Sequence, residues 1–152
     1  MSDLRSAPIP DLRDDDHVRG EGRLAYFYGD FACPHCAVAH ARLDGRRVFR
    51  HFALRAKHPR ALPLAHAAEA AALQGLFWEF HDSLYADQGR LDDPHLWERA
   101  ERLGLDVERF EADRRSAAVA ERVARDVRDA VRAGIVATPT VIIDGVLHPG
   151  WR

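Results

Sequence analysis

Short apolar runs alternate with a helical repeat along the first third of the chain, and this pattern predicts a mixed α/β fold. The aromatic run LAYFY starts at Leu24 and is followed by Gly29, which favours a buried strand. The run VFRHFAL (48–54) favours a second strand that is apolar on both faces. Between them, CPHCAVAHARL carries a proline near its first turn and stops at Asp44-Gly45, which is typical of a helix. This order predicts a βαβ unit with parallel strands and a right-handed crossover.

The spacing of apolar residues becomes helical from residue 63 to about residue 133. Asp93-Pro94 predicts an N-cap followed by a proline at the first helical position, Gly104 is expected to end that helix, and Asp106 is expected to cap the next one. The last helical segment has an apolar stripe made of Ala120, Val123, Ala124, Val127, Ala130 and Val131. We interpret its opposite face as a solvated helix surface carrying Glu121, Arg122, Arg125, Asp126, Arg128, Asp129 and Arg132.

The two ends of the chain differ from this middle part. Near the C-terminus, TVIIDGVLH places Asp144-Gly145 between two apolar runs, which predicts a β-hairpin with a two-residue turn. Residues 1–22 are polar and include the run Asp14-Asp15-Asp16, so we expect a loose N-terminal arm.

Composition narrows the class of protein. Of 152 residues, 47% are hydrophobic and 30% charged, and the formal net charge is −2, as expected for a soluble globular protein. This charge balance gives no global reason to expect nucleic acid or an anionic membrane surface as a partner. The first twenty residues contain no apolar segment of the kind found in signal peptides, so we expect a cytoplasmic location.

Two cysteines, Cys33 and Cys36, are the most informative residues of the sequence. Two cysteines are too few for a disulfide scaffold or a four-cysteine zinc site, and Ala37 rules out the C-x-x-C-H pattern of haem attachment. The pair stands where the first strand passes into the first helix. Unpaired N–H groups at the helix N-terminus favour the thiolate of Cys33, with His35 as an additional donor. Cys36, one turn further, is then expected to be the resolving thiol.

Four segments resemble the DsbA-like branch of the thioredoxin-fold oxidoreductases: YGDFACPHC, VFRHFAL with a following HP, AAEAAALQGLFWEFHDSLY and GIVATPTVIIDG. The resemblance implies a thioredoxin-like α/β fold formed by residues 23–62 and 134–152, with 63–133 as an inserted helical subdomain. It also implies thiol–disulfide exchange with protein or peptide substrates and with a redox partner that the sequence does not identify. No cofactor is expected beyond the dithiol itself.

The resemblance also assigns roles to site residues. It implies a redox centre made of Cys33, Pro34, His35 and Cys36. It further implies a cis peptide bond before Pro139, facing the cysteines, and an extended substrate that pairs with the backbone around Thr138.

The chain departs from the family pattern at three places. The helix after the cysteines is short, because Asp44-Gly45 arrives only about two turns later. Phe27 occupies the position where relatives commonly carry a buried acid, and no helix follows the hairpin before Arg152. From Phe27 and His35 we expect a strongly oxidising dithiol that turns over slowly. From the absent final helix we expect an uncovered apolar surface and a homodimer that packs near Trp151.

Other interpretations of the cysteines remain open at this stage. Cys33 and Cys36 could hold a metal ion or a cluster at a dimer interface, together with His35 or His40, in a thioredoxin-fold module without catalysis. The same pair could serve as a redox sensor. A glutathione-linked transferase is a weaker alternative, because such chemistry needs only one thiol or hydroxyl.

For other conspicuous residues, a structural role is the preferred interpretation. His51 is expected in the core and Asp30 in a turn, although Asp30 could also accept a proton in place of the acid missing at Phe27. Five aromatic-ring residues recur at helical spacing and are expected in the core, with a substrate groove as the alternative: Phe77, Trp78, Phe80, His81 and Trp97.

Overall fold

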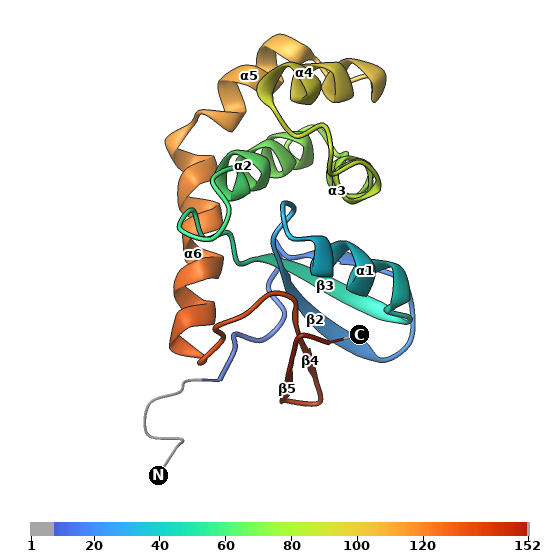
Figure 1. Cartoon of the computed structure of the whole chain (residues 1–152), viewed down its shortest axis with the longest axis vertical. Coiled ribbons are helices and arrows are strands. Elements are labelled where there is room, and N and C mark those ends of the chain that lie inside the picture. Colours follow the sequence, from blue (N-terminus) through green and yellow to red (C-terminus); the bar gives the residue numbers. More distant parts are fainter. Residues whose placement is uncertain (1–7, 152) are drawn as a thin grey trace.

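A five-stranded sheet with helices on both faces forms the centre of the computed structural model, which describes residues 8–151 (Figure 1). The strands lie in the order β1-β3-β2-β4-β5. β2 pairs with β3 in parallel, and the pairings β1–β3, β2–β4 and β4–β5 are antiparallel. Their bounds are β1 His17–Arg19, β2 Leu24–Gly29, β3 Arg46–His51, β4 Thr140–Ile143 and β5 Val146–Pro149.

The helix α1 (Pro34–Arg42) connects the two parallel strands, which confirms the predicted βαβ unit. Phe27 of β2 and Phe49 of β3 stack at 6.0 Å on the sheet face beneath this helix, and both are almost fully buried. Ala39 of α1 belongs to the same core cluster. The apolar strands therefore set the position of α1 and of the cysteines at its start.

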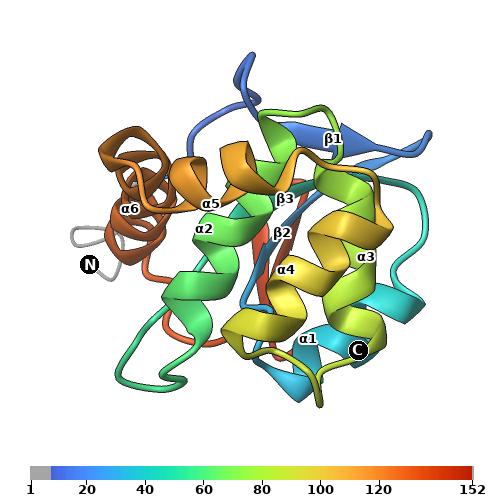
Figure 2. The ribbon, with the colours of Figure 1, turned by 90° about the horizontal axis from the view of Figure 1, so that it is seen from above.

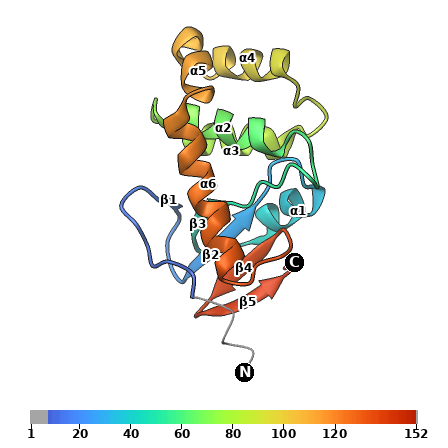
Figure 3. The same ribbon diagram turned by 90° about the vertical axis from the view of Figure 1, so that its left-hand side faces the viewer.

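Four helices follow β3 and stack outward from one end of the sheet (Figures 1 and 2). Figure 3 shows α2 and α3 next to the sheet, with α4 and α5 beyond them. Their bounds are α2 Ala61–Ala72, α3 Phe77–Ala86, α4 Asp93–Arg102 and α5 Val107–Arg114. The cap at Asp106 is confirmed, since its side chain accepts the N–H of Arg109 at 3.0 Å. The predicted cap at Asp93 is wrong by one residue, because Asp92 is the N-cap and Asp93 is already helical.

The long helix α6 (Ala117–Arg132) covers the other face of the sheet, where Ala130 packs with Tyr28 and Ile142. Two sequence expectations for α6 are wrong. Ala124 and Val131, both assigned to the apolar stripe, are exposed, Val131 to 59%. Asp126, assigned to the solvated face, is fully buried and accepts the backbone N–H of His51 at 3.0 Å. The N–H at the end of β3 would otherwise be buried without a partner, and the carboxylate satisfies it.

The expectation of a loose arm over residues 1–22 is wrong for its second half, while residues 1–7 lie outside the described residues. β1 forms one edge of the sheet, and the segment before it wraps around Arg50. The buried guanidinium donates to the carbonyl oxygens of Pro10 and Asp11 at 2.7 and 2.9 Å and pairs with Asp16 at 2.8 Å. A buried arginine needs such partners, and this polar segment supplies them.

The C-terminal hairpin forms as predicted. Asp144 and Gly145 have φ angles of 52° and 77°, and two left-handed residues in succession match the two-residue turn that suits strand twist. After β5, Trp151 packs against the core cluster on the α1 side of the sheet. The dimer expected near Trp151 stays a prediction. Within residues 8–151, every helix is too short or too polar to span a membrane.

Candidate active site

The two cysteines occupy the start of α1, where the chain leaves β2. Cys33 is the N-cap residue and Pro34 begins the helix, where its missing N–H costs no hydrogen bond. The carbonyl oxygen of Asp30 accepts the N–H of Cys33 at 3.1 Å and so closes a turn between strand and helix. Both cysteines are free thiols, with Cys33 3% and Cys36 0% exposed.

The surroundings separate the acidities of the two thiols. The pKa of Cys33 is lowered to about 5, mainly because the Cys36 thiol donates a hydrogen bond to the Cys33 sulfur. Burial opposes this shift, while the side chain of Thr138 and backbone N–H groups at the helix start add to it. Burial and the neighbouring Cys33 raise the pKa of Cys36 far above its ordinary value. Cys33 is thus the group that ionises first, as the nucleophile assignment requires.

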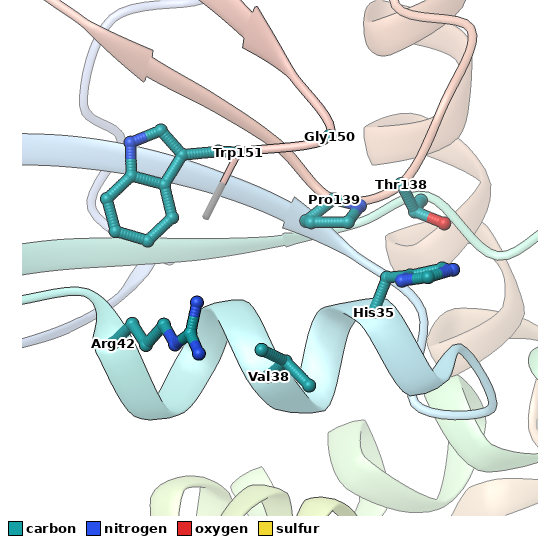
Figure 4. Close-up of a pocket in the computed structure, with 7 residues that line it drawn as sticks. All are labelled: His35, Val38, Arg42, Thr138, Pro139, Gly150 and Trp151. Atoms are coloured by element: carbon teal, nitrogen blue, oxygen red, sulfur yellow. The ribbon is translucent and has the colours of Figure 1, made fainter.

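His35 contributes to this acidity differently from the expectation. Its backbone N–H is among the donors that lower the pKa of Cys33. The imidazole is exposed and faces a surface groove (Figure 4). In the described residues, thiolate stabilisation by His35 therefore passes through the main chain and not through the ring.

The loop before β4 faces the cysteines. The peptide bond between Thr138 and Pro139 is cis, as predicted, and the Cys33 sulfur lies 3.9 Å from the carbonyl oxygen of Thr138. The carbonyl oxygen of Pro139 accepts the N–H of Gly150 at 2.7 Å, which ties this loop to the end of β5. The structure thus brings together residues that are more than a hundred positions apart in the sequence.

A groove of about 410 Å³ runs from this point along α1 (Figure 4). One wall is formed by α1 and the other by the segments around Pro139 and Gly150. Its lining residues are His35, Val38, Arg42, Thr138, Pro139, Gly150 and Trp151. The expected substrate-binding residues Thr138 and Pro139 are therefore next to an open groove and not under a closed surface.

Asp30 and Phe27 occupy the positions that the sequence singled out behind the cysteines. Phe27 lies in the apolar core, so no carboxylate is present at that point. Asp30 is buried, and its carboxylate accepts the N–H of Ala32 at 2.8 Å, in agreement with the expected turn role. The same carboxylate pairs with the Nδ1 of His58 at 2.7 Å. The His-Pro pair that follows the second strand was the available sequence signal for His58.

Two further residues at the site escaped the sequence analysis. The side-chain N–H₂ of Gln88 donates to the carbonyl oxygens of Phe31 and Cys33 at 2.9 and 3.0 Å. The hydroxyl of Tyr85 in α3 donates to the carbonyl oxygen of Asp30 at 3.4 Å. Side chains from the helical part of the chain therefore stabilise the turn that carries Cys33. No sequence motif predicts this role for either residue.

His40, one of the two histidines considered as metal ligands, lies in a cluster that contains neither cysteine. Among residues 8–151, the one group of three side chains that could ligate a metal is His40, His81 and Asp82. Arg19 already binds Asp82 through two hydrogen bonds of 2.8 Å, and Arg47 donates to His40 at 3.1 Å. In the described part of the chain, neither cysteine belongs to such a group.

His51 and the aromatic set are mostly core residues, as predicted. His51 is buried and bonds the carboxylate of Glu69 at 2.7 Å. Of the five aromatic-ring residues, Phe77, Phe80 and His81 are buried, Trp78 is half-buried and Trp97 is 40% exposed. None of the five is among the groove's lining residues.

Comparisons with known proteins agree with this arrangement. Among solved structures, a thioredoxin-like oxidoreductase from Silicibacter pomeroyi DSS-3 superimposes with a TM-score of 0.82 at 24% identity, covering 92% of this chain and 86% of that one. Wolbachia pipientis alpha-DsbA1 matches with a TM-score of 0.76 at 21% identity, covering 93% of this chain and 86% of that one. Oxidised BdbD from Bacillus subtilis matches with a TM-score of 0.78 at 18% identity, covering 95% and 89%. At these identities the likeness shows the fold.

Among curated proteins, the relatives are longer than this chain. The Na(+)/H(+) antiporter NhaA 1 of Mycolicibacterium vanbaalenii is 40% identical over 151 residues, which cover 90% of this chain and 24% of that protein. The antiporter NhaA of Herminiimonas arsenicoxydans is 44% identical over 142 residues, covering 86% of this chain and 22% of that protein. This chain thus spans about a quarter of the length of these relatives.

The sequence model of the DSBA-like thioredoxin domain matches residues 48–151, a span that begins after the two cysteines and includes the Thr138–Pro139 loop. The fold, the C-x-x-C pair at the start of α1 and the cis-proline loop opposite it agree with this match. The chain belongs to the family of DSBA-like thioredoxin domains.

Proposed function

We propose that this chain is a thiol:disulfide oxidoreductase that exchanges disulfides with protein or peptide substrates through Cys33 and Cys36. The observation that carries the proposal is the C-x-x-C pair at the start of α1, with the Cys33 sulfur 3.9 Å from the carbonyl oxygen of Thr138 in the cis-proline loop; the lowered pKa of Cys33 and the raised pKa of Cys36 support it. A low-pKa cysteine at a helix N-terminus is both a good nucleophile and a good leaving group. The groove along α1 offers space for an extended substrate next to Thr138, whose carbonyl oxygen lies 3.9 Å from the Cys33 sulfur.

In the oxidising direction, a substrate thiolate attacks the Cys33 sulfur of the Cys33–Cys36 disulfide. Cys36 leaves and takes up a proton, and a mixed disulfide joins the substrate to Cys33. A second substrate thiolate attacks the substrate sulfur of this bond, and Cys33 leaves as a thiolate. Two substrate thiols are thereby oxidised to one disulfide, and the Cys33–Cys36 disulfide is reduced by two electrons.

Matched cysteine variants test the proposal. Cys33→Ser should abolish both the reduction of insulin and the oxidation of a dithiol peptide, because no sulfur remains to form the mixed disulfide. Cys36→Ser should form the mixed disulfide and accumulate it, since the resolving thiol is absent. Alkylation of the reduced protein at mildly acidic pH should label Cys33 before Cys36. Preferential labelling of Cys36 would contradict the assignment of roles.

Metal analysis of the purified protein separates this proposal from a metal-binding module. Turnover by the metal-free protein supports the oxidoreductase. Stoichiometric zinc or iron without turnover would support the alternative and defeat the proposal. The ion transport named for the longer relatives is not proposed for this chain, which corresponds to about a quarter of their length.

A further inference from the structure

The wall of the groove that α1 forms carries one guanidinium group, that of Arg42. His35, Val38 and Arg42 stand three and four residues apart on α1 and therefore share one helix face. Figure 4 shows them in this order along the helix, with Pro139 opposite the His35 end and Trp151 opposite the Arg42 end. One end of the groove is thus at Thr138, whose carbonyl oxygen lies 3.9 Å from the Cys33 sulfur, and the other end is at the guanidinium of Arg42.

Arg42 is exposed, and within residues 8–151 it takes part in no ion pair or side-chain hydrogen bond. Among the described residues that line the groove, none carries a carboxylate. A cation in the last turn of a helix is favourable on its own account, because it complements the negative end of the helix dipole. The helix dipole does not neutralise the guanidinium of Arg42 as a carboxylate would. The positive charge therefore remains available to a ligand.

The distances along the groove match an extended peptide. The Cα of Arg42 lies about 10 Å along the helix from that of His35, at about 1.5 Å per residue. Helical side chains point back toward the N-terminus, and Figure 4 shows the guanidinium on the Val38 side of its own backbone. Cys33 lies nine residues before Arg42, or about 13 Å along the helix by the same rise, and the side chains of Arg42 and of a glutamate together would cover what a two-residue step leaves. In an extended strand, two residues on the same face are separated by about 7 Å.

We propose that the groove selects substrates in which an acidic side chain stands two residues from the reacting cysteine and pairs with Arg42. This inference rests on the proposed disulfide exchange. With the substrate cysteine joined to Cys33, the second residue along an extended chain faces the same wall and reaches the guanidinium. With a neutral residue at that position, Arg42 stays solvated. Exchange then proceeds without the electrostatic attraction between the substrate and Arg42.

Single-cysteine peptides activated as mixed disulfides with thionitrobenzoate provide the test, and the reduced protein's rate of thionitrobenzoate release is the readout. Cys33 attacks the peptide sulfur, and thionitrobenzoate leaves with the electron pair. The peptides differ only in carrying Gln, Glu or Lys two residues before or two residues after the cysteine. We expect Glu at one of these places to react about fivefold faster than Gln at low salt, the size expected of an exposed ion pair. This preference should vanish in about 1 M salt.

Two variants decide whether Arg42 is the cause. Arg42→Glu should reverse the preference in favour of Lys, an outcome that a merely structural arginine would not give. Arg132→Glu is the matched control, because Arg132 is also an exposed arginine in the last turn of a helix, belongs to α6 on the other face of the sheet, and does not line the groove. That variant should keep the wild-type preference.

Equal rates for the Glu and Gln peptides at both places would overturn the inference, as would a Glu preference that survives in Arg42→Glu. In either case, reaction of the Gln peptides and reduction of insulin would leave the proposed function intact. Failure of every peptide and of insulin would instead overturn the proposed function.

Discussion

The side-chain amide of Gln88 donates a hydrogen bond of 3.0 Å to the carbonyl oxygen of Cys33. Gln88 follows α3, whereas Cys33 precedes α1, so this bond joins the helical part of the chain to the turn that carries Cys33. The same amide also holds the carbonyl of Phe31 at 2.9 Å. Both bonds fix the direction in which the first turn of α1 points its N–H groups, and those groups favour the thiolate.

Gln88→Ala should raise the pKa of Cys33 by about one unit and lower the free energy of unfolding by about 1–3 kcal/mol, because two carbonyls lose their donor. Thiolate absorbance against pH measures the first effect and urea unfolding the second. Gln74→Ala is the control, since Gln74 bonds only the backbone of Asp106 among the described residues. An unchanged pKa of Cys33 in Gln88→Ala would leave Gln88 a purely structural residue.

Thr138→Val should also raise the pKa of Cys33, because the side-chain hydrogen bond from Thr138 favours the thiolate. A hydrogen bond to a charged group contributes about 1.5–3 kcal/mol, so we expect a rise of about one unit or more. The measurement is the pH dependence of the alkylation rate at Cys33. Thr140→Val serves as the control, since its hydroxyl donates to the carbonyl oxygen of Ala137 and is not among the groups that shift the pKa of Cys33. A similar shift in both variants would point to a general loosening of the loop.

The reduction potential should depend on pH in two regimes that meet near pH 5. Below the pKa of Cys33, reduction takes up two protons with two electrons, and the potential should fall by about 59 mV per pH unit. Above it, Cys33 stays a thiolate, one proton is taken up, and the slope should be about 30 mV per unit. The lowered pKa thus stabilises the reduced form fully above the unfolded thiol's pKa, and this stabilisation is lost as pH falls through about 5.

Equilibration with glutathione buffers at several pH values gives these slopes. A break near pH 8 to 9 would mean that Cys33 is an ordinary thiol. The same series tests the oxidising poise expected from the sequence, because a potential near that of thioredoxin, about −270 mV, would contradict it.

Glu69→Gln should lower the free energy of unfolding by about 3–5 kcal/mol at neutral pH. The buried carboxylate bonds His17 and His51 at 2.7 Å each, and these partners hold its pKa well below the ordinary value. A lowered carboxyl pKa adds stability above the unfolded pKa, and this contribution is lost as pH falls through the folded value. The acid branch of the stability curve should therefore be flatter in Glu69→Gln.

Glu121→Gln is the matched control for Glu69, because its side chain is 67% exposed and pairs with Arg128 at 2.9 Å. We expect a change within about 0.5 kcal/mol for this exposed pair. Equal effects of the two substitutions in thermal or urea unfolding would contradict the structural role of Glu69.

Much of the fold could be predicted because its signals are local. Each of these signals depends on a few neighbouring residues: the spacing of apolar residues around Cys33, the Asp144-Gly145 turn, and the caps at Asp106 and Gly104. The cis bond before Pro139 came from the family resemblance and not from periodicity. The order of the two thiol acidities followed from their places in one helical turn.

What could not be predicted depends on partners distant in the sequence. Asp126 has the polar spacing of a surface residue, yet the end of β3, 75 residues earlier, leaves an N–H that the carboxylate binds. Gln88 gives no signal because its two acceptors are backbone carbonyls, which every residue has. The spacing of apolar residues predicts which face of a single helix or strand is buried. A contact between two elements can be predicted only when the positions of both in the fold are known.

The wrapping of residues 10–16 around Arg50 also sets how far this unit could move on a tether. A polypeptide joined ahead of residue 8 would be anchored to the folded unit near Pro10 and not near Gly22. About a dozen residues, or about 40 Å of fully extended chain, are thereby removed from its reach. In a longer protein, the volume in which Cys33 could meet a substrate would shrink accordingly, and the local concentration of a fused partner would rise.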